Sequence, residues 1–113
     1  MSAEPKYLYL TTTGRRTGLP REIEIWFTPH RARYYLVAEH GREAHWVKNL
    51  LVNPVVHVRV GTRRFPARAR LVDRRAERCL VAAVRRRFET KYGWGDGLVV
   101  ELARVLGHAR ASR

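Results

Sequence analysis

The sequence contains little cysteine and no long hydrophobic run. Cys79 is the single cysteine of the 113 residues, which excludes an intrachain disulfide and a thiolate metal cluster built by this chain. Because Cys79 falls within an apolar helical pattern, we expect it to be a small buried core residue. No apolar run approaches the roughly eighteen residues of a membrane span, and Met1–Lys6 lacks the basic-then-apolar pattern of a signal peptide. These absences predict a cytoplasmic protein without a membrane span.

Acidic residues and lysines are also scarce. The chain has 23 lysines and arginines against 10 acidic residues, which gives a formal net charge of +13, and only Lys6, Lys48 and Lys91 are lysines. A positive charge of this size indicates nucleic acid, an anionic membrane surface or an anionic ligand as a partner, and composition does not choose among the three. The arginine bias is equally consistent with a high-GC genome.

Runs of β-branched and aromatic residues, in places alternating strictly with polar ones, predict five strands in the first 71 residues. The expected strands cover residues 7–12, 22–27, 33–38, 55–60 and 64–71. Pro66 indicates that the last of these is an edge strand or carries a bulge. Short turns at 29–32 and 61–63 predict antiparallel hairpins between the second and third and between the fourth and fifth strands.

Helical spacing of apolar residues follows in two segments. Residues 45–51 predict a short helix that Asn53-Pro54 ends. After Asp73, which we expect to be an N-cap, Leu80, Val81, Val84 and Phe88 form the stripe of a second helix. The glycines of 93–97 end that helix, and 98–102 return as a sixth strand, with another short helix as the alternative. The pattern predicts one domain over 1–113, mainly β with flanking helices (α+β), in the form of a small antiparallel barrel.

The segment from Thr11 to Arg21 joins the first two strands and carries the clearest motif. Two glycines and a proline shape a tight loop that gathers three guanidinium groups with several hydroxyls and backbone amides. The planar fork of arginine binds phosphate or carboxylate oxygens through two hydrogen bonds at once. The loop therefore suits an oligoanionic ligand, although a solvated basic hairpin explains the same residues equally well.

Three segments together resemble the deazaflavin (F420)-dependent nitroreductase family of flavin/deazaflavin oxidoreductases. They are Thr-Thr-Gly-Arg-Arg-Thr-Gly-Leu-Pro-Arg at 12–21, Tyr-Leu-Val-Ala at 35–38, and Trp-Val-Lys-Asn-Leu-Leu-Val-Asn-Pro at 46–54. Their order and spacing match the family pattern, and the resemblance covers about residues 7–72. Longer members have an N-terminal helical extension, whereas six residues precede the first expected strand here.

The resemblance implies a split β-barrel of the FMN-binding-like type, with six or so antiparallel strands, usually as a homodimer. It implies coenzyme F420 as the cofactor, a deazaflavin that carries a phosphate and an oligoglutamate tail. The reaction implied is hydride transfer to a small activated alkene, quinone or nitro compound. FMN is the alternative cofactor, and related split-barrel families bind FAD or heme.

The resemblance also assigns roles to residues by their position. The implied cofactor-binding residues are Arg15, Arg16, Thr17, Gly18, Arg21, Val37, Ala38, Glu39, His40, Trp46 and Asn49. The three arginines would contact the phosphate and tail, and the backbone of 37–39 would hold the edge of the ring. His40 stands where the family commonly has a lysine on the phosphate. Trp46 and Asn49 would wall the ring or fix the nearby backbone.

The implied substrate pocket is aromatic and departs from the family pattern. Trp26, Tyr92 and Trp94 would surround the substrate, and Tyr92 would act as a catalytic residue by donating a hydrogen bond to a nitro or carbonyl oxygen. A purely structural role in closing the barrel explains Tyr92 and Trp94 equally well. Trp26 replaces a residue that is more often tyrosine. Glu39 places a negative charge where a small residue is common.

Other classes of function have weaker support in the sequence. Ser2 and Ser112 lie in the tails, which argues against a Ser/His/Asp hydrolase. No metal-binding spacing connects the five histidines, His30, His40, His45, His57 and His108. The alternative from another class is a nucleic-acid binder that uses a face formed by Arg59, Arg64, Arg68 and Arg70. We rank it below an oxidoreductase with a small-molecule substrate because net charge is non-specific.

Overall fold

A computed structural model describes residues 4–105 of the chain. The elements in chain order are β1 (Tyr7–Thr13), β2 (Pro20–Trp26), β3 (Thr28–His30), β4 (Arg33–Ala38), the 3-10 turn η1 (Gly41–Glu43), α1 (His45–Val52), β5 (Val55–Val60), β6 (Arg63–Leu71), α2 (Arg78–Tyr92) and β7 (Leu98–Arg104). Ser2, His108 and Ser112 lie outside the described residues. Across the described part of the chain, no helix combines the length and the apolar character needed to cross a membrane.

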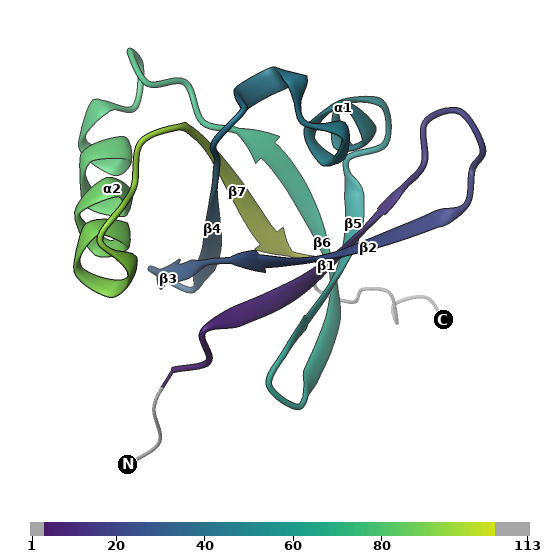
Figure 1. The fold of residues 1–113 in the computed structure, drawn as a ribbon, viewed down its shortest axis with the longest axis horizontal. Coiled ribbons are helices and arrows are strands. Elements are labelled where there is room, and N and C mark those ends of the chain that lie inside the picture. The colour runs from purple at the N-terminus through teal and green to yellow at the C-terminus, as the bar shows by residue number, and fades with distance from the viewer. Residues whose placement is uncertain (1–3, 106–113) are drawn as a thin grey trace.

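The seven strands form one antiparallel sheet in the order β2-β1-β5-β6-β7-β4-β3. The sheet curls into a half-barrel (Figure 1). Phe27 separates β2 from β3, and the chain changes partner there: Leu10 of β1 lies opposite Ile23, whereas Thr28 lies opposite Tyr35 of β4. Among the described strand pairs, none joins β2 to β4. The barrel is therefore split along this seam, which confirms the predicted architecture.

The concave face of the sheet holds the main core. Its buried members are Leu8, Leu10, Phe27, Leu36, Leu50, Val56, Val58, Val60, Phe65, Ala67, Ala69, Val100 and Leu102. On β6 Phe65, Ala67 and Ala69 are buried, and Arg64, Pro66, Arg68 and Arg70, which alternate with them, are exposed. Because side chains of a strand point to opposite faces in turn, this alternation fixes which face of the sheet is inward.

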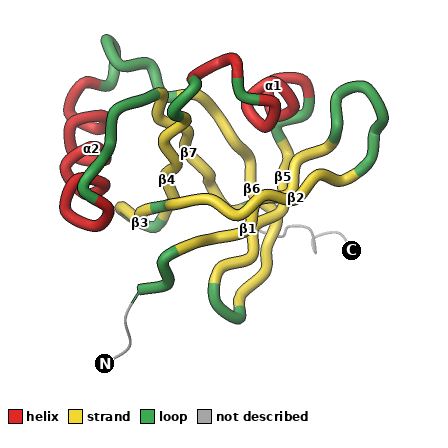
Figure 2. Tube along the Cα trace, viewed as in Figure 1, coloured by secondary structure: helices red, strands yellow, loops and turns green. Residues whose placement is uncertain are grey.

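Helix α2 covers the outer face of the sheet at β4 and β7 (Figure 2). Of the predicted stripe, Val81, Val84 and Phe88 are buried, and Leu80 is half-buried against them. The helix ends at Gly93, whose φ of 76° is left-handed, and glycine is the residue that adopts this conformation without a steric penalty. The chain then returns as β7, which confirms the sixth predicted strand and excludes the short helix that competed with it.

Two predictions near the start of α2 are wrong. Cys79 is exposed, because it lies in the first turn of the helix on the side away from the sheet. Asp73 accepts hydrogen bonds from the amides of Arg75 and Ala76 at 2.8 and 3.1 Å. It therefore caps the turn that precedes α2, and the helix itself begins at Arg78.

Two predictions about the strands also need correction. Strand β6 lies between β5 and β7, so Pro66 is on neither edge of the sheet. The carbonyl of Pro66 accepts a hydrogen bond from the backbone amide of Val105. The imide nitrogen of Pro66 therefore also faces β7, at a position beyond the last residue pair of β6 and β7, where a missing N–H group breaks no hydrogen bond of the sheet. The predicted turn at 29–32 is shorter, because β3 continues to His30. Arg31 and Ala32 alone make this turn, with φ of 52° and 67°.

A buried carboxylate joins three strands to the beginning of α2. Glu101 of β7 is 3% exposed and accepts hydrogen bonds from Arg33, Tyr35 and Arg70 at 3.0, 2.8 and 2.8 Å. Arg70 also donates two hydrogen bonds to Glu77, at 2.8 and 2.7 Å. Burial alone would raise the pKa of Glu101, but the hydrogen bonds from Arg70 and Tyr35 outweigh burial and hold its pKa below the ordinary value.

Replacing Glu101 with glutamine is expected to lower the free energy of unfolding by about 2 kcal/mol at pH 7, since it removes the charge that two arginines face. The pKa of Glu101 is depressed in the folded state. Its contribution is therefore present above the ordinary glutamate pKa of about 4.3 and is lost as the pH falls through the folded-state value. Urea denaturation at pH 7 and pH 3 measures both effects, with the exposed Glu89→Gln as control. A difference from wild type that persists at low pH would contradict this assignment.

Candidate functional site

The loop between β1 and β2 is held by its own backbone. Gly14 donates a hydrogen bond to the carbonyl of Leu19 and accepts one from Gly18, both at 2.8 Å. The φ of Gly18 is 73°, which favours glycine at this position. The hydroxyl of Thr17 accepts a further bond from the amide of Leu19 at 3.2 Å. The tight loop that the sequence predicts between the first two strands is thus present as a defined hairpin.

A cavity of about 360 Å³, here named the arginine pocket, lies between this hairpin and α1. It is lined by Thr12, Gly14, Arg15, Arg16, Thr17, Arg21, Ile23, His45, Trp46 and Asn49. Three guanidinium groups and no carboxylate are among these lining residues. The pocket therefore concentrates positive charge and hydrogen-bond donors, which suits a ligand with several anionic groups.

Asn49 of α1 fastens Arg15 to the helix. Asn49 is 5% exposed, and its Oδ1 accepts hydrogen bonds from the Arg15 backbone amide at 3.2 Å and from Arg15 Nη1 at 2.8 Å. Its Nδ2 donates to Thr12 Oγ1 at 3.1 Å. Arg15 Nη2 lies 3.2 Å from Nδ1 of His45. This geometry favours the second of the two implied roles of Asn49, which was to fix the nearby backbone.

A second cavity, of about 520 Å³, adjoins the first and is here named the aromatic pocket. It is lined by Tyr7, Glu24, Ile25, Trp26, Val37, Ala38, Glu39, His40, Ala44, Trp46 and Trp94. These include all three tryptophans of the chain. Trp46 lines both cavities, so its indole stands where the two pockets meet. A flat aromatic ring fits a pocket with such walls.

The seam of the barrel gives the aromatic pocket free backbone groups. Strand β4 pairs with β7 as far as Ala38 but with β3 only as far as Tyr35, so residues 36–38 keep one edge unpaired among the described strands. Gly97 packs behind this edge, where a Cβ atom would lie 2.5 Å from the carbonyl oxygen of Ala38. The unpaired amides and carbonyls are donors and acceptors available to a heterocycle.

Tyr92 is not among the lining residues of either pocket. Its ring stacks on Trp26 with centroids 4.3 Å apart. Its hydroxyl accepts a hydrogen bond from the Phe27 amide at 3.0 Å and lies 2.7 Å from the carbonyl oxygen of Lys6. Burial raises the pKa of Tyr92 to about 12. The Tyr92 hydroxyl has one proton, and it is already hydrogen-bonded to the main chain. This geometry favours a structural role, in which Tyr92 supports the ring of Trp26, over the predicted hydrogen bond from Tyr92 to the substrate.

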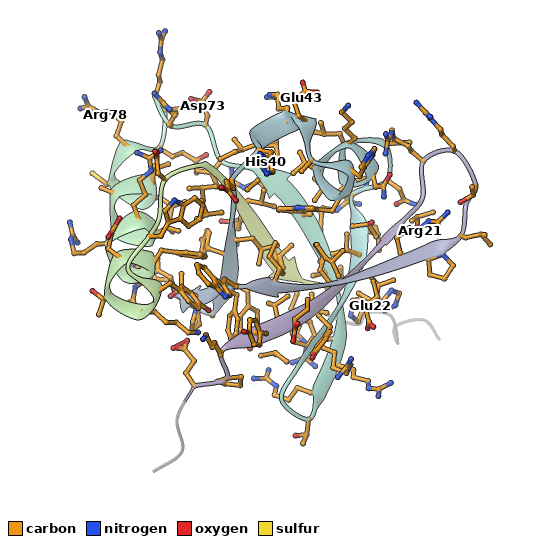
Figure 3. The ribbon with its side chains drawn as sticks, viewed as in Figure 1. Arg21, Glu22, His40, Glu43, Asp73 and Arg78 are labelled. Atoms are coloured by element: carbon orange, nitrogen blue, oxygen red, sulfur yellow. The ribbon has the colours of Figure 1, made fainter. Side chains whose placement is uncertain are left out.

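His40 and Glu39 stand at the mouth of the aromatic pocket. Their side chains are 76% and 71% exposed, and His40 Nε2 lies 4.0 Å from Glu39 Oε1. Figure 3 shows His40 beside η1 and Arg21 on the hairpin, on the two sides of α1. The two pockets thus bring together every predicted site residue except Gly18 and Tyr92.

The structure adds lining residues that the sequence analysis did not name as site residues. They are Thr12, Gly14, Ile23 and His45 in the arginine pocket and Tyr7, Glu24, Ile25 and Ala44 in the aromatic pocket. A signal for Glu24 was available, because strict alternation places it on the same strand face as Trp26. Tyr7 becomes a neighbour of Trp26 through the register of β1 and β2, in which the two lie opposite each other.

The arginine face predicted for nucleic acid is partly neutralised. Arg59 packs over the ring of Tyr9 at 4.0 Å and lies 3.5 Å from Glu22. Arg70 belongs to the Glu101 network. Arg64 and Arg68 stay exposed. Two of the four arginines of this face therefore already have acidic partners within the chain. This weakens the hypothesis of a nucleic-acid binder, which rests on positive charge.

Comparisons with known proteins identify the family of the chain. The model of the F420H(2)-dependent quinone reductase family matches residues 1–94. An F420H(2)-dependent quinone reductase of Mycobacterium tuberculosis is 37% identical over 72 residues, which cover 61% of this chain and 48% of that protein. A Mycobacterium bovis protein described as a putative F420H(2)-dependent quinone reductase gives the same values. The chain spans about half the length of these curated relatives.

Solved structures share the fold. An F420-H2 dependent reductase superposes with a TM-score of 0.62 at 24% identity and covers 92% of this chain and 98% of its own. The heme storage protein HutZ of Vibrio cholerae gives 0.70 at 25% identity, covering 92% and 84%. A putative pyridoxamine 5'-phosphate oxidase of Listeria innocua gives 0.70 at 14%, covering 89% and 85%. With the fold shared and the family model matching most of its length, the chain belongs to the F420H(2)-dependent quinone reductase family.

Proposed function

We propose that this chain binds reduced coenzyme F420 and transfers a hydride from it to a quinone. The observation that carries the proposal is the pair of adjoining pockets that share Trp46. One pocket is cationic and the other is aromatic, and F420 has an anionic tail and a flat ring. Family membership and the activity for which the mycobacterial relatives are named support the same cofactor and substrate class.

The arginine pocket fits the phosphate and oligoglutamate of the cofactor. Arg16 and Arg21 line it from the two sides of the hairpin, and each guanidinium can bind two anionic oxygens. Arg15 is held in place by Asn49, so its remaining N–H groups lose little entropy when they bind a ligand. FMN has a single phosphate, which would leave part of this cationic lining unused.

The aromatic pocket fits the ring of the cofactor and a substrate stacked upon it. The unpaired backbone edge of 36–38 supplies hydrogen bonds to a heterocycle, and Trp46 supplies a flat wall. Trp26 is braced by Tyr92 in a parallel stack, so this wall is rigid. When bound, reduced F420 supplies the hydride, while the chain orients the two rings and excludes water from between them.

We also propose the homodimer and the cytoplasmic location that the sequence analysis predicted. Leu51, Val52 and Val55 are 49%, 67% and 40% exposed at the end of α1 and the start of β5. Exposed apolar side chains that are close in sequence support a subunit contact. Sedimentation velocity of the purified chain measures its assembly state.

Titration with F420, followed through the fluorescence of the cofactor, tests the first step. We expect micromolar binding and about ten-fold weaker binding in Arg16→Ala and in Arg21→Ala, since each substitution removes charge-assisted hydrogen bonds. Arg64→Ala, an exposed arginine on the outer face of β6, is the matched control and should bind as wild type does. A protein that binds no F420 at micromolar concentration, or one that is purified with bound FMN, would overturn the proposed cofactor.

Asn49→Ala should both destabilise the fold and loosen Arg15. The loss of a buried amide with three hydrogen bonds costs about 2 kcal/mol of unfolding free energy, measured in urea. The freed Arg15 should also weaken F420 binding several-fold. Asn49→Asp keeps an acceptor for Arg15 but adds a negative charge to the lining of the arginine pocket, so it should keep the loop in place and still bind F420 more weakly than wild type. Equal F420 affinities for wild type and Asn49→Ala would show that the contact to Arg15 does not prepare the pocket.

Reduced F420 mixed with the protein and menadione should be oxidised at a rate proportional to protein concentration. The reaction is followed through the visible absorbance of the oxidised cofactor. Trp46→Ala, which removes the wall shared by the pockets, should lower kcat/KM by about ten-fold or more, since a flat wall aligns the rings. His57→Ala, on the outer face of β5, is the control. If the protein binds F420 tightly but no quinone oxidises the reduced cofactor, the proposed hydride transfer is wrong and only cofactor binding remains.

A further inference from the structure

The last turn of α2 carries a lysine whose ammonium group is bound to the main chain. Lys91 Nζ donates hydrogen bonds to the carbonyl oxygens of Pro5 and Phe27 at 2.9 and 3.0 Å. It also lies 3.5 Å from Oε2 of Glu4. The side chain of Lys91 is 18% exposed. Since an ammonium group has three N–H donors, these three oxygens are enough to satisfy all of them.

Aromatic rings complete the surroundings of this ammonium group. Lys91 Nζ lies 3.9 Å from the centroid of the Phe27 ring and 5.1 Å from that of the Tyr92 ring. Both distances are in the range of cation–π interactions. Burial lowers the pKa of Lys91, and the carboxylate of Glu4 opposes this change. The ammonium group has therefore exchanged much of its water for a defined set of carbonyl, carboxylate and aromatic contacts.

Tyr92, the next residue, binds the same two segments of main chain. Its hydroxyl lies 2.7 Å from the carbonyl oxygen of Lys6 and 2.9 Å from that of Phe27, and it accepts a hydrogen bond from the Phe27 amide. Lys91 and Tyr92 thus fasten residues 5–6, which precede β1, and Phe27, which follows β2. We name these contacts the α2 clamp. They join positions that are 64 to 86 apart in the sequence.

The α2 clamp encloses one residue pair of the sheet. Tyr7 follows Lys6 directly and Trp26 precedes Phe27 directly, and the two lie opposite each other as the last pair of β1 and β2 at this end. Strand β2 is an edge strand of the described sheet, so one ladder alone holds Trp26. Residue pairs at the end of a ladder open more easily than central pairs. The clamp therefore fixes the part of the β1–β2 hairpin that pairing holds least.

We propose that Lys91 is a positioning residue of the aromatic pocket, and that through the α2 clamp it holds Tyr7 and Trp26 as the wall against which the quinone lies. Both of these side chains line the aromatic pocket, whereas Lys91 does not. The proposal rests on the proposed function, because it concerns the same pocket and substrate. A wall that is fixed before binding saves the quinone the cost of ordering it.

The clamp acts on the quinone more than on the cofactor. Trp46 and the backbone edge of 36–38 are the groups proposed to hold the cofactor ring, and Lys91 makes no hydrogen bond with them among the described residues. The arginine pocket, which is proposed to hold the tail, has neither Lys91 nor Tyr92 in its lining. Loss of the clamp should therefore weaken quinone binding and leave most of the F420 affinity.

Lys91→Met removes the ammonium group and keeps an unbranched apolar side chain. Without cofactor, hydrogen exchange measured by mass spectrometry should be about ten-fold faster at residues 6–9 and 25–28 and unchanged in β5, since charged hydrogen bonds to both segments are lost. Saturable quenching of tryptophan fluorescence by menadione should give a Kd about five-fold higher, because the wall must now be ordered on binding. Lys48→Met, outside the lining of both pockets, is the matched control and should behave as wild type.

Kinetics with F420 separate positioning from a general loss of structure. In Lys91→Met the KM for menadione should rise about five-fold, while kcat and the Kd of F420 change by less than about two-fold, since the lost contact contributes uniform binding of the quinone. Tyr92→Phe keeps the ring that stacks on Trp26 and should give a smaller rise. Because both side chains hold the Phe27 carbonyl, the double variant should lower kcat/KM by less than the product of the single effects.

Four results would overturn the proposal. They are wild-type hydrogen exchange in Lys91→Met, an unchanged menadione Kd in that variant, the absence of saturable quenching in the wild-type protein, and a loss of F420 affinity as large as the loss of menadione affinity. Tyr92→Phe provides the same measurements if Lys91→Met does not fold. If F420 does not bind at all, the proposed hydride transfer is wrong, and the measurements without cofactor still decide whether Lys91 positions the wall.

Discussion

The gap between β2 and β4 is the constraint on which the rest of the structure depends. The sheet curls far enough to close, but Phe27 ends one pairing and begins the next, so two strand edges face each other without joining. A closed barrel would satisfy these backbone groups internally and would have a core of side chains alone. Leaving the seam open creates a slot with hydrogen-bonding walls, and the aromatic pocket occupies it.

Helix α1 contributes residues to both pockets of the candidate site. It is a short helix, His45–Val52, yet it supplies the indole that both pockets share and the amide that fixes Arg15. Leu50 anchors the helix in the main core. Since one face carries all of these contacts, a shift of α1 would change both pockets together. The anchoring by Asn49 and Leu50 is therefore part of the binding site.

Local patterns in the sequence predicted most of the fold. Alternation on β6 identified its inward face, and the stripe of Val81, Val84 and Phe88 identified the buried side of α2. Cys79 was misplaced because an apolar context two positions from a buried residue does not fix the phase of a helix. The extent of β3 was missed because pairing with β4 overrides the turn chemistry of Pro29.

The candidate site was predictable where it rests on a contiguous motif and not where it rests on tertiary contacts. The loop of 12–21 and the helix of 46–54 carry their own signatures. The hydrogen bond of Tyr92 to Phe27 spans 65 positions, and the contact of Arg70 with Glu101 spans 31. Neither follows from spacing, because the partners meet only after the sheet has curled. The same is true of Tyr7 and Glu24 in the aromatic pocket.

The position of Trp46 between the two pockets has a consequence for the orientation of a bound ligand. A molecule with an acidic end and a flat end can lie across Trp46 in two ways, and one of them places the acidic end beside Glu24 and Glu39. For the cofactor of the proposed function, attraction by the three arginines favours the orientation in which the acidic end enters the arginine pocket. In that proposal, the unequal charge of the two pockets sets the direction in which the ligand lies across Trp46.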